Sequence, residues 1–159
     1  MIVQVVIVDL QLLHCRVTVK NTNVYFWFTI VYGLNNMADR KSLWRALVDI
    51  SAGTRDPWCI MGDFNAVFDV THRSNGRLVS EYEMRDLAQC IEDANLISHP
   101  SVGHWFSWDN RGQGQDRIAS RIDHAFVNDL WMEGEFSSQI QYLNPVSYTH
   151  LTLPTKRIV

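Results

Sequence analysis

One short stretch of the chain carries residues whose types and spacing suit catalysis. Residues 58–61 are apolar and lead through Gly62 to Asp63 and, two positions later, Asn65. The apolar run has the length of a short buried strand, and the glycine allows the backbone to turn sharply after it. Asp63 and Asn65 then lie on the same side of an extended tripeptide. A carboxylate and an amide at the carboxyl end of a strand are typical of ligand sites in open α/β sheets. An ordinary Asx turn is the simpler alternative.

Composition and charge limit the classes of protein in which these residues could act. The 159 residues are 47% hydrophobic and 11% aromatic, enough for the core of one domain or part of one. A formal charge of -3 gives no general basic field, so any nucleic acid would be bound through local geometry. The apolar first residues are too short a run to span a bilayer, and no membrane partner is expected.

The cysteines indicate a reducing compartment. The chain has three cysteines, Cys15, Cys59 and Cys90. An odd number does not pair completely into disulfides, and no two of them have the CxxC spacing of metal ligands. We therefore assign them no zinc and expect a nuclear or cytoplasmic protein that is not secreted.

Strand patterns dominate the chain. The alternation of Cys15, Val17 and Val19 with polar neighbours, His14 among them, is typical of a half-buried strand. The predicted strands are residues 2–8, 14–20, 24–32, 58–61, 104–108, 122–127 and 139–143.

Two helices are expected beside these strands. Residues 39–52 carry apolar side chains at helical spacing and precede Gly53, a candidate C-cap. Residues 80–94 begin with the capping-box pair Ser80 and Glu83. These strands and helices together predict a mixed α/β or α+β architecture, with a largely antiparallel sheet and flanking helices.

Two further blocks complete a pattern that begins at Asp63. Residues 103–110 read GHWFSWDN, and residues 120–128 read SRIDHAFVN. Together with VYG at 31–33, SLW at 42–44 and GDFNAV at 62–67, this order resembles the endonuclease/exonuclease/phosphatase superfamily, which has the DNase I-like fold. The resemblance is strongest to the endonuclease domain that precedes reverse transcriptase in plant LINE-type retroelements. Each block alone is weak, whereas all of them in order are specific.

The resemblance implies a chemistry for four residues. It implies a four-layer α+β sandwich and Mg²⁺-dependent hydrolysis of a phosphate ester, with DNA as the favoured substrate and partner. Asp63 would orient or deprotonate the attacking water, while Asn65 and Tyr32 would contact the phosphate. Asp123 would fix the tautomer of a catalytic histidine. Ordinary strand positions in contact with solvent are the alternative for Tyr32 and Asp123.

Four further residues are candidates for contact with the substrate. By their positions in the motifs, these are Trp108, Asn110, Ser120 and Arg121. For the aromatic residues of block 103–110, packing is favoured over base stacking. For Arg111, Arg117 and Arg121, solvated loop charges are the default. The histidines His72, His104 and His124 have no ligand spacing and are expected to be core or surface residues.

The chain also departs from the family pattern. The family's Gln-Glu pair, whose Glu is the main metal ligand, has no counterpart here, and Tyr148-Thr149-His150 stands near the place of Ser-Asp-His. We therefore assign no metal ligand and expect residues 1–147 to be an incomplete domain, followed by a non-native or disordered tail at 148–159. The expected result is negligible hydrolysis by this chain. The alternative is a degenerate retroelement relic that at most binds nucleic acid weakly.

Overall fold

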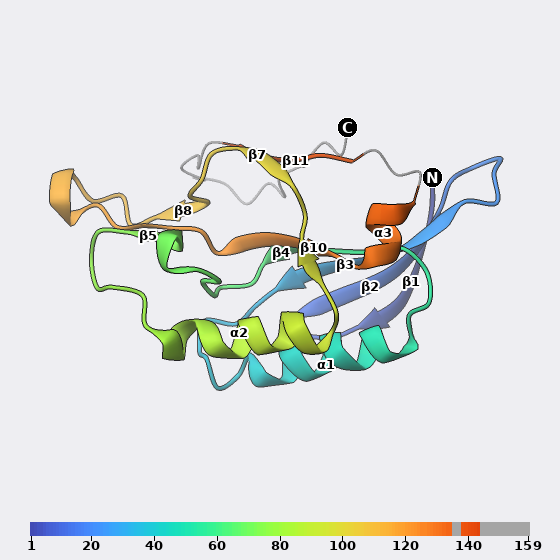
Figure 1. Cartoon of the computed structure of the whole chain (residues 1–159), viewed down its shortest axis with the longest axis horizontal. Helices are drawn as coiled ribbons and strands as arrows, with labels where there is room; N and C mark the ends of the chain where they lie inside the picture. The colour runs from blue at the N-terminus through green and yellow to red at the C-terminus, as the bar shows by residue number, and fades with distance from the viewer. Residues whose placement is uncertain (135–137, 144–159) are drawn as a thin grey trace.

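The computed structural model of the protein describes residues 1–134 and 138–143, and its largest element is a six-stranded sheet (Figure 1). The strands run in the spatial order β1-β2-β3-β4-β10-β6. Only β3 and β4 are parallel neighbours in this sheet, and the other pairs are antiparallel, as predicted. Their bounds are β1 Ile2–Val8, β2 Leu12–Thr18, β3 Tyr25–Tyr32, β4 Trp58–Asp63, β10 Asp123–Val127 and β6 Ile97–Ser98.

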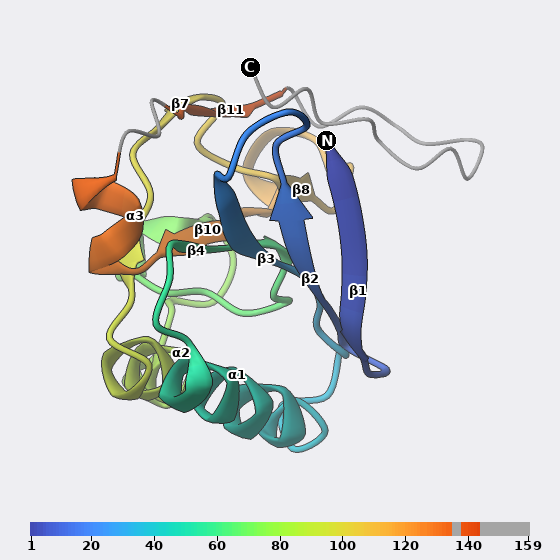
Figure 2. The ribbon, with the colours of Figure 1, turned by 90° about the vertical axis from the view of Figure 1, so that its right-hand side faces the viewer.

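Two helices cover one face of this sheet, α1 (Lys41–Gly53) and α2 (Glu81–Asp93) (Figure 2). Each presents an apolar stripe, which includes Leu43 and Leu47 on α1 and Leu87 on α2. A short helix, α3 (Asp129–Glu133), packs Trp131 against buried residues of β4 and β10 in a second, smaller cluster. The predicted mixture of a mainly antiparallel sheet with flanking helices is confirmed.

Smaller strands lie beside the main sheet. One group has the order β5 (Arg73–Ser74), β9 (Ala119–Ser120) and β8 (Trp108–Asp109), and β7 (Ser101–Gly103) pairs in parallel with β11 (Ile140–Tyr142). Two 3₁₀ turns, η1 (Val70–His72) and η2 (Gly114–Asp116), complete the elements of the described residues.

The core fixes the motif in place. Phe64 is completely buried, its ring stacks on Trp44 of α1 at 6.3 Å, and it meets Phe126 of β10 edge to face at 5.4 Å. Aromatic contacts of this kind add to the free energy gained by burying the rings. The chain segment that carries Asp63 and Asn65 is therefore anchored from within the core.

Several local predictions are wrong. The strand does not end before Gly62 but continues to Asp63, and the sharp turn falls at Asn65, whose φ is 49°. Of the predicted strand at 104–108, only Trp108 lies in a strand, as the first residue of β8, and residues 104–107 form an irregular segment after β7. Gly53 is the last residue of α1 and not its C-cap, because Thr54 takes that position in an extended conformation.

His14 differs from the half-buried pattern because it is 5% exposed. Its Nδ1 lies 2.8 Å from Thr29 Oγ1, and its ring stacks on Trp27. A hydrogen-bonded partner makes burial of the imidazole tolerable. Both sides of β2 are therefore covered at this position.

Other predictions lie outside the described residues. Residues 144–159 include His150 and the whole of the predicted tail at 148–159. Across the described ranges, no helix is both long enough and apolar enough to cross a membrane.

Candidate active site

A row of three polar residues crosses one end of the sheet. Tyr32 on β3 is the register partner of Asp63 on β4, and Asp63 is in turn the partner of Asp123 on β10. Residues directly opposite each other on paired strands project to the same face. Three of the four predicted catalytic residues are therefore neighbours, although 31 and 60 positions separate them in the sequence.

The turn after β4 is fixed by hydrogen bonds. Asn65 N donates to Asp63 Oδ1 at 2.8 Å, which forms the Asx turn considered as an alternative, and Phe64 N donates to Ile122 O at 2.9 Å. On the other side, Gly33 N donates to Asp63 O at 2.6 Å. The turn thus holds the Asp63 carboxylate in place and does not exclude a catalytic role.

Asn65 pairs with a residue that was not predicted. Its Nδ2 donates to Asn35 Oδ1 and, at 3.4 Å, to Gly33 O. Asn35 belongs to the loop between β3 and α1, which has no strand or helix pattern of its own. Its only sign in the sequence is that a polar residue closely follows the VYG strand end.

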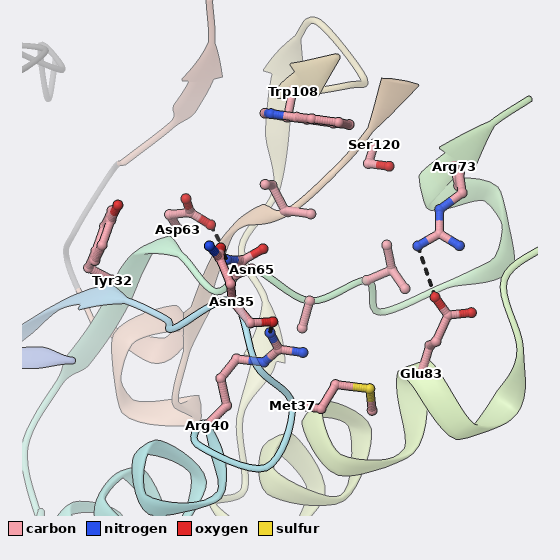
Figure 3. A pocket seen from close by; sticks show the side chains of 13 residues that line it. Tyr32, Asn35, Met37, Arg40, Asp63, Asn65, Arg73, Glu83, Trp108 and Ser120 are labelled. Atoms are coloured by element: carbon pink, nitrogen blue, oxygen red, sulfur yellow. Dashed lines mark hydrogen bonds and ion pairs between the residues drawn. The ribbon is translucent and has the colours of Figure 1, made fainter. Parts of the chain in front are cut away.

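These residues share a pocket of about 450 Å³ (Figure 3). Tyr32, Asp63 and Asn65 line it, and so do Trp108 and Ser120 from the small three-stranded sheet. Figure 3 places Asp63 and Asn65 on one side and Trp108 and Ser120 above. The remaining lining residues are Asn35, Met37, Arg40, Ala66, Val67, Arg73, Glu83 and Ile122.

Three other predicted site residues are not among those that line the pocket: Asp123, Arg121 and Asn110. The Arg121 guanidinium lies over the rings of Trp105 and Tyr142, at 4.7 and 4.2 Å from their centroids. Contacts of this kind attract the cation to the ring faces.

Asn110 stabilises the turn between β8 and β9. Its Oδ1 accepts from the backbone N–H groups of Gly112 and Ile118, and its Nδ2 donates to Asp116 O. The roles predicted for Asn110, Ser120, Arg121 and Trp108 in substrate binding stay predictions.

Two cations line the pocket at different depths. Arg40 is 5% exposed, and burial lowers the pKa of its guanidinium. Arg73 forms an ion pair with Glu83 at 3.0 Å. Burial raises the pKa of Glu83, but its hydrogen bonds with Ser80 and Arg73 outweigh that effect and bring the pKa to about 2. Glu83 therefore stays ionised across the neutral range.

Two stacked histidines lie behind the turn. The rings of His72 and His124 are 5.3 Å apart, and His124 Nε2 donates to Ala66 O at 2.8 Å. Burial lowers the pKa of His124 to about 3 and, together with the charge of Arg121, that of His72 to about 4. Both are core residues, one of the two settings predicted for them.

The donor set at the strand ends suits a hard divalent cation. Asp63 and Asp123 bring two carboxylates to adjacent positions, and Mg²⁺ sites commonly combine one or two carboxylates with water and substrate phosphate oxygens. Within residues 1–134 and 138–143, no three His, Cys, Asp or Glu side chains form a metal-binding group. The chemistry of these two carboxylates fits Mg²⁺, and they would hold part of its coordination shell.

Comparison with known proteins gives a family match over most of the chain. The sequence model described as "Endonuclease/Exonuclease/phosphatase family" matches residues 2–145. None of the curated proteins matches the chain.

Solved structures show the same fold. The "Endonuclease domain of TRAS1, a telomere-specific non-LTR retrotransposon" has a TM-score of 0.60 and 13% identity over 77% of this chain and 52% of its own. Sphingomyelinase C from Streptomyces griseocarneus has a TM-score of 0.57 and 12% identity over 93% of this chain and 52% of its own. A beta hairpin deletion mutant of beta toxin from Staphylococcus aureus has a TM-score of 0.52 and 15% identity over 92% of this chain and 55% of its own. The chain spans about half the length of each of these structures.

Proposed function

Because the chain belongs to the Endonuclease/Exonuclease/phosphatase family, we propose that it is part of a Mg²⁺-dependent phosphodiester hydrolase that acts on DNA. The observation that carries this proposal is the row formed by Tyr32, Asp63 and Asp123 at the end of the sheet. It places Tyr32 and Asp63 in the lining of a pocket that Asn65 also lines, and it makes Asp123 the neighbour of Asp63 on the next strand.

In the proposed reaction, water attacks the phosphorus of a phosphodiester, the bond from phosphorus to one ester oxygen breaks, and that oxygen takes up a proton and leaves as an alcohol. The Asp63 carboxylate, fixed by the Asn65 backbone N–H, orients the water and accepts its proton. The Asn65 amide and the exposed Tyr32 hydroxyl contact the phosphoryl oxygens. Asp123, as the resemblance implies, supports a histidine. Bound Mg²⁺ would supply stabilisation of the charge that develops on the phosphate.

DNA is the substrate that we favour. The TRAS1 structure is an endonuclease domain of a retrotransposon, and its similarity supports the same kind of parent for this chain, which we place among plant LINE-type elements. The exposed ring of Trp108 beside the pocket offers a stacking surface for a base. The three cysteines are free and buried, which supports a nuclear or cytoplasmic setting.

The 159 residues by themselves are proposed to cleave at background level. The described residues supply only part of a Mg²⁺ site, and catalytic groups that act as a unit lose most of their rate when one is missing. The longer parent protein would supply the remaining groups.

A cleavage assay tests both parts of the proposal. Supercoiled plasmid is incubated with Mg²⁺ and either this chain or the longer open reading frame that contains it, each also as Asp63→Ala. We expect nicking that depends on Asp63 from the longer protein and only background from the chain. Equal nicking by the longer protein and its Asp63→Ala variant would reject the hydrolase and support a relic that only binds nucleic acid. A parallel arm with sphingomyelin vesicles identifies a lipid phosphodiesterase if hydrolysis occurs there instead.

A further inference from the structure

The loop between β3 and α1, residues 33–39, is held by two buried polar side chains that lie outside it. Gln11, in the turn between β1 and β2, is 2% exposed, and Arg40, the N-cap residue of α1, is 5% exposed. We propose that Gln11 and Arg40 are positioning residues that hold this loop so that Asn35 fixes the carboxamide of Asn65. The inference rests on the proposed function of the same pocket.

Gln11 ties both ends of the loop to the sheet. Its Oε1 accepts from Leu34 N at 2.9 Å, and its Nε2 donates to Asp39 O and to Ser42 Oγ, both at 3.1 Å. Its backbone carbonyl also accepts from Tyr32 N at 2.9 Å. Every polar group of this buried side chain therefore contacts the loop or the start of α1.

Arg40 holds the middle of the loop from the helix side. Its Nη1 donates to Leu34 O at 2.8 Å and to Asn35 O at 2.9 Å. Its side chain makes no hydrogen bond that caps α1, and its buried Nε has no partner among the described residues. Burial of a guanidinium carries a desolvation cost. Its hydrogen bonds go to the loop carbonyls and not to the helix end.

The contacts form a relay that reaches the catalytic turn. Arg40 holds the backbone of Asn35, the Asn35 side chain accepts from Asn65 Nδ2, and Asn65 N donates to Asp63 Oδ1. Figure 3 shows Asn35 between the Arg40 guanidinium and Asn65. A carboxamide held in one orientation does not have to be ordered when the substrate binds, which is the advantage of a preorganised site.

Asn128 provides a control that distinguishes positioning of Asn65 from a general contribution to the stability of the fold. Asn128 makes a comparable set of contacts at the opposite end of β4, because its Oδ1 accepts from Trp58 N and Trp131 N and its Nδ2 donates to Asp56 O. Asn128→Asp and Gln11→Glu make the same chemical change, from an amide to an acid of equal shape.

The test uses the ¹⁵N-labelled 159-residue chain without metal or substrate. The side-chain amide signals of Asn65 are assigned by their loss in Asn65→Asp. We expect Gln11→Glu and Arg40→Met to shift these signals toward those of a solvent-exposed amide. Asn128→Asp is expected to lower the melting temperature and leave them in place. Unchanged Asn65 signals in Gln11→Glu and Arg40→Met, or an equal shift in Asn128→Asp, would overturn the inference.

Milder variants cover the case in which Gln11→Glu or Arg40→Met does not fold. Ser42→Ala removes one acceptor of Gln11, and Arg40→Lys keeps the charge with fewer donors. Each should give a smaller shift in the same direction, and Asn65 signals that do not move in either would count against the relay. Because no cleavage is measured, loss of the proposed hydrolase activity would not affect this outcome.

Discussion

Asp63 and Asp123 are register partners on two adjacent antiparallel strands, β4 and β10. The pairing of β-strands, and not a flexible loop, therefore sets the relation between the two carboxylates. Like charges at opposed positions repel each other and together attract a divalent cation. The same strand end carries the Asx turn of Asn65, so one turn links the acidic pair to the pocket.

Mg²⁺ is expected to stabilise the chain through this pair. At a Mg²⁺ concentration about ten times the Kd, binding should add about 1.4 kcal/mol to the free energy of unfolding and raise Tm by about 4 °C. The shift should disappear when Asp63→Asn and Asp123→Asn are combined. Thermal unfolding followed by circular dichroism measures it, with Asp116→Asn in the η2 turn as control. An undiminished shift in the double variant would place the cation elsewhere.

Gly62 should tolerate no side chain. Its φ is 147°, and a Cβ would lie 2.1 Å from Val31 O on the neighbouring strand. Gly62→Ala must therefore force β3 and β4 apart at Tyr32 and Asp63, and we expect a loss of about 3 kcal/mol or more in denaturant unfolding. Gly53→Ala is the matched control, because nothing lies within 4 Å of a Cβ there. That change should stabilise α1 by up to about 1 kcal/mol.

Local patterns predicted the long strands, the two long helices and the sequence blocks, whereas contacts between distant residues were not visible. The Ser80–Glu83 capping box and the strand at 2–8 were recognisable because each depends on a few neighbouring residues, and both are present. The hydrogen bond between Asn35 and Asn65 spans 30 positions, so no spacing rule indicates it.

The sequence pattern also did not indicate that β2 is buried on both sides at His14. His14 occupies a polar position in an alternating run, and only the packing of Trp27 and the hydroxyl of Thr29 make it a core residue. Helix α3 has five residues, too few to show a helical period. Trp108 and Ser120, predicted as substrate contacts, line the same pocket as Asp63 and Asn65 only because three short strands assemble beside the turn.

Stability should fall as the pH is lowered through the range of the buried histidines. The pKa values of His72 and His124, about 4 and about 3, lie below the ordinary value of 6.5. The unfolded chain therefore binds protons first. Stability that is complete above pH 6.5 is lost as the pH falls toward 4 and 3, by about 2 to 3 kcal/mol for each histidine at pH 4.5. Urea unfolding between pH 7.5 and 4.5 measures this loss. His72→Gln should reduce it, while the exposed His104→Gln should not, and equal profiles for the two variants would contradict the assignment.

The cap of α2 should couple the helix to Arg73 in the pocket. Glu83 Oε2 accepts from Ser80 N at 3.0 Å, and Oε1 accepts from Arg73 Nη2 at the same distance. Ser80→Ala should cost about 1 kcal/mol, and Glu83→Ala more, because it also leaves Arg73 without its ion pair. A double-mutant cycle in urea measures the coupling between the two residues. If the losses in free energy of unfolding from Ser80→Ala and Glu83→Ala were strictly additive, the two residues would stabilise the helix independently.

Strand β1 is expected to drive aggregation of the chain. All seven of its residues are exposed, and six are Ile or Val; across the described residues β1 pairs with β2 alone. An apolar edge of this kind pairs readily with other chains, and a lysine on it prevents such pairing. Val5→Lys should therefore lower light scattering several-fold at a given protein concentration with little change in Tm, since Val5 is 51% exposed. Leu78→Lys, in a loop and 89% exposed, removes a comparable apolar side chain away from the edge and should leave the scattering high. If Leu78→Lys reduced scattering as much as Val5→Lys, general surface hydrophobicity and not the strand edge would be responsible.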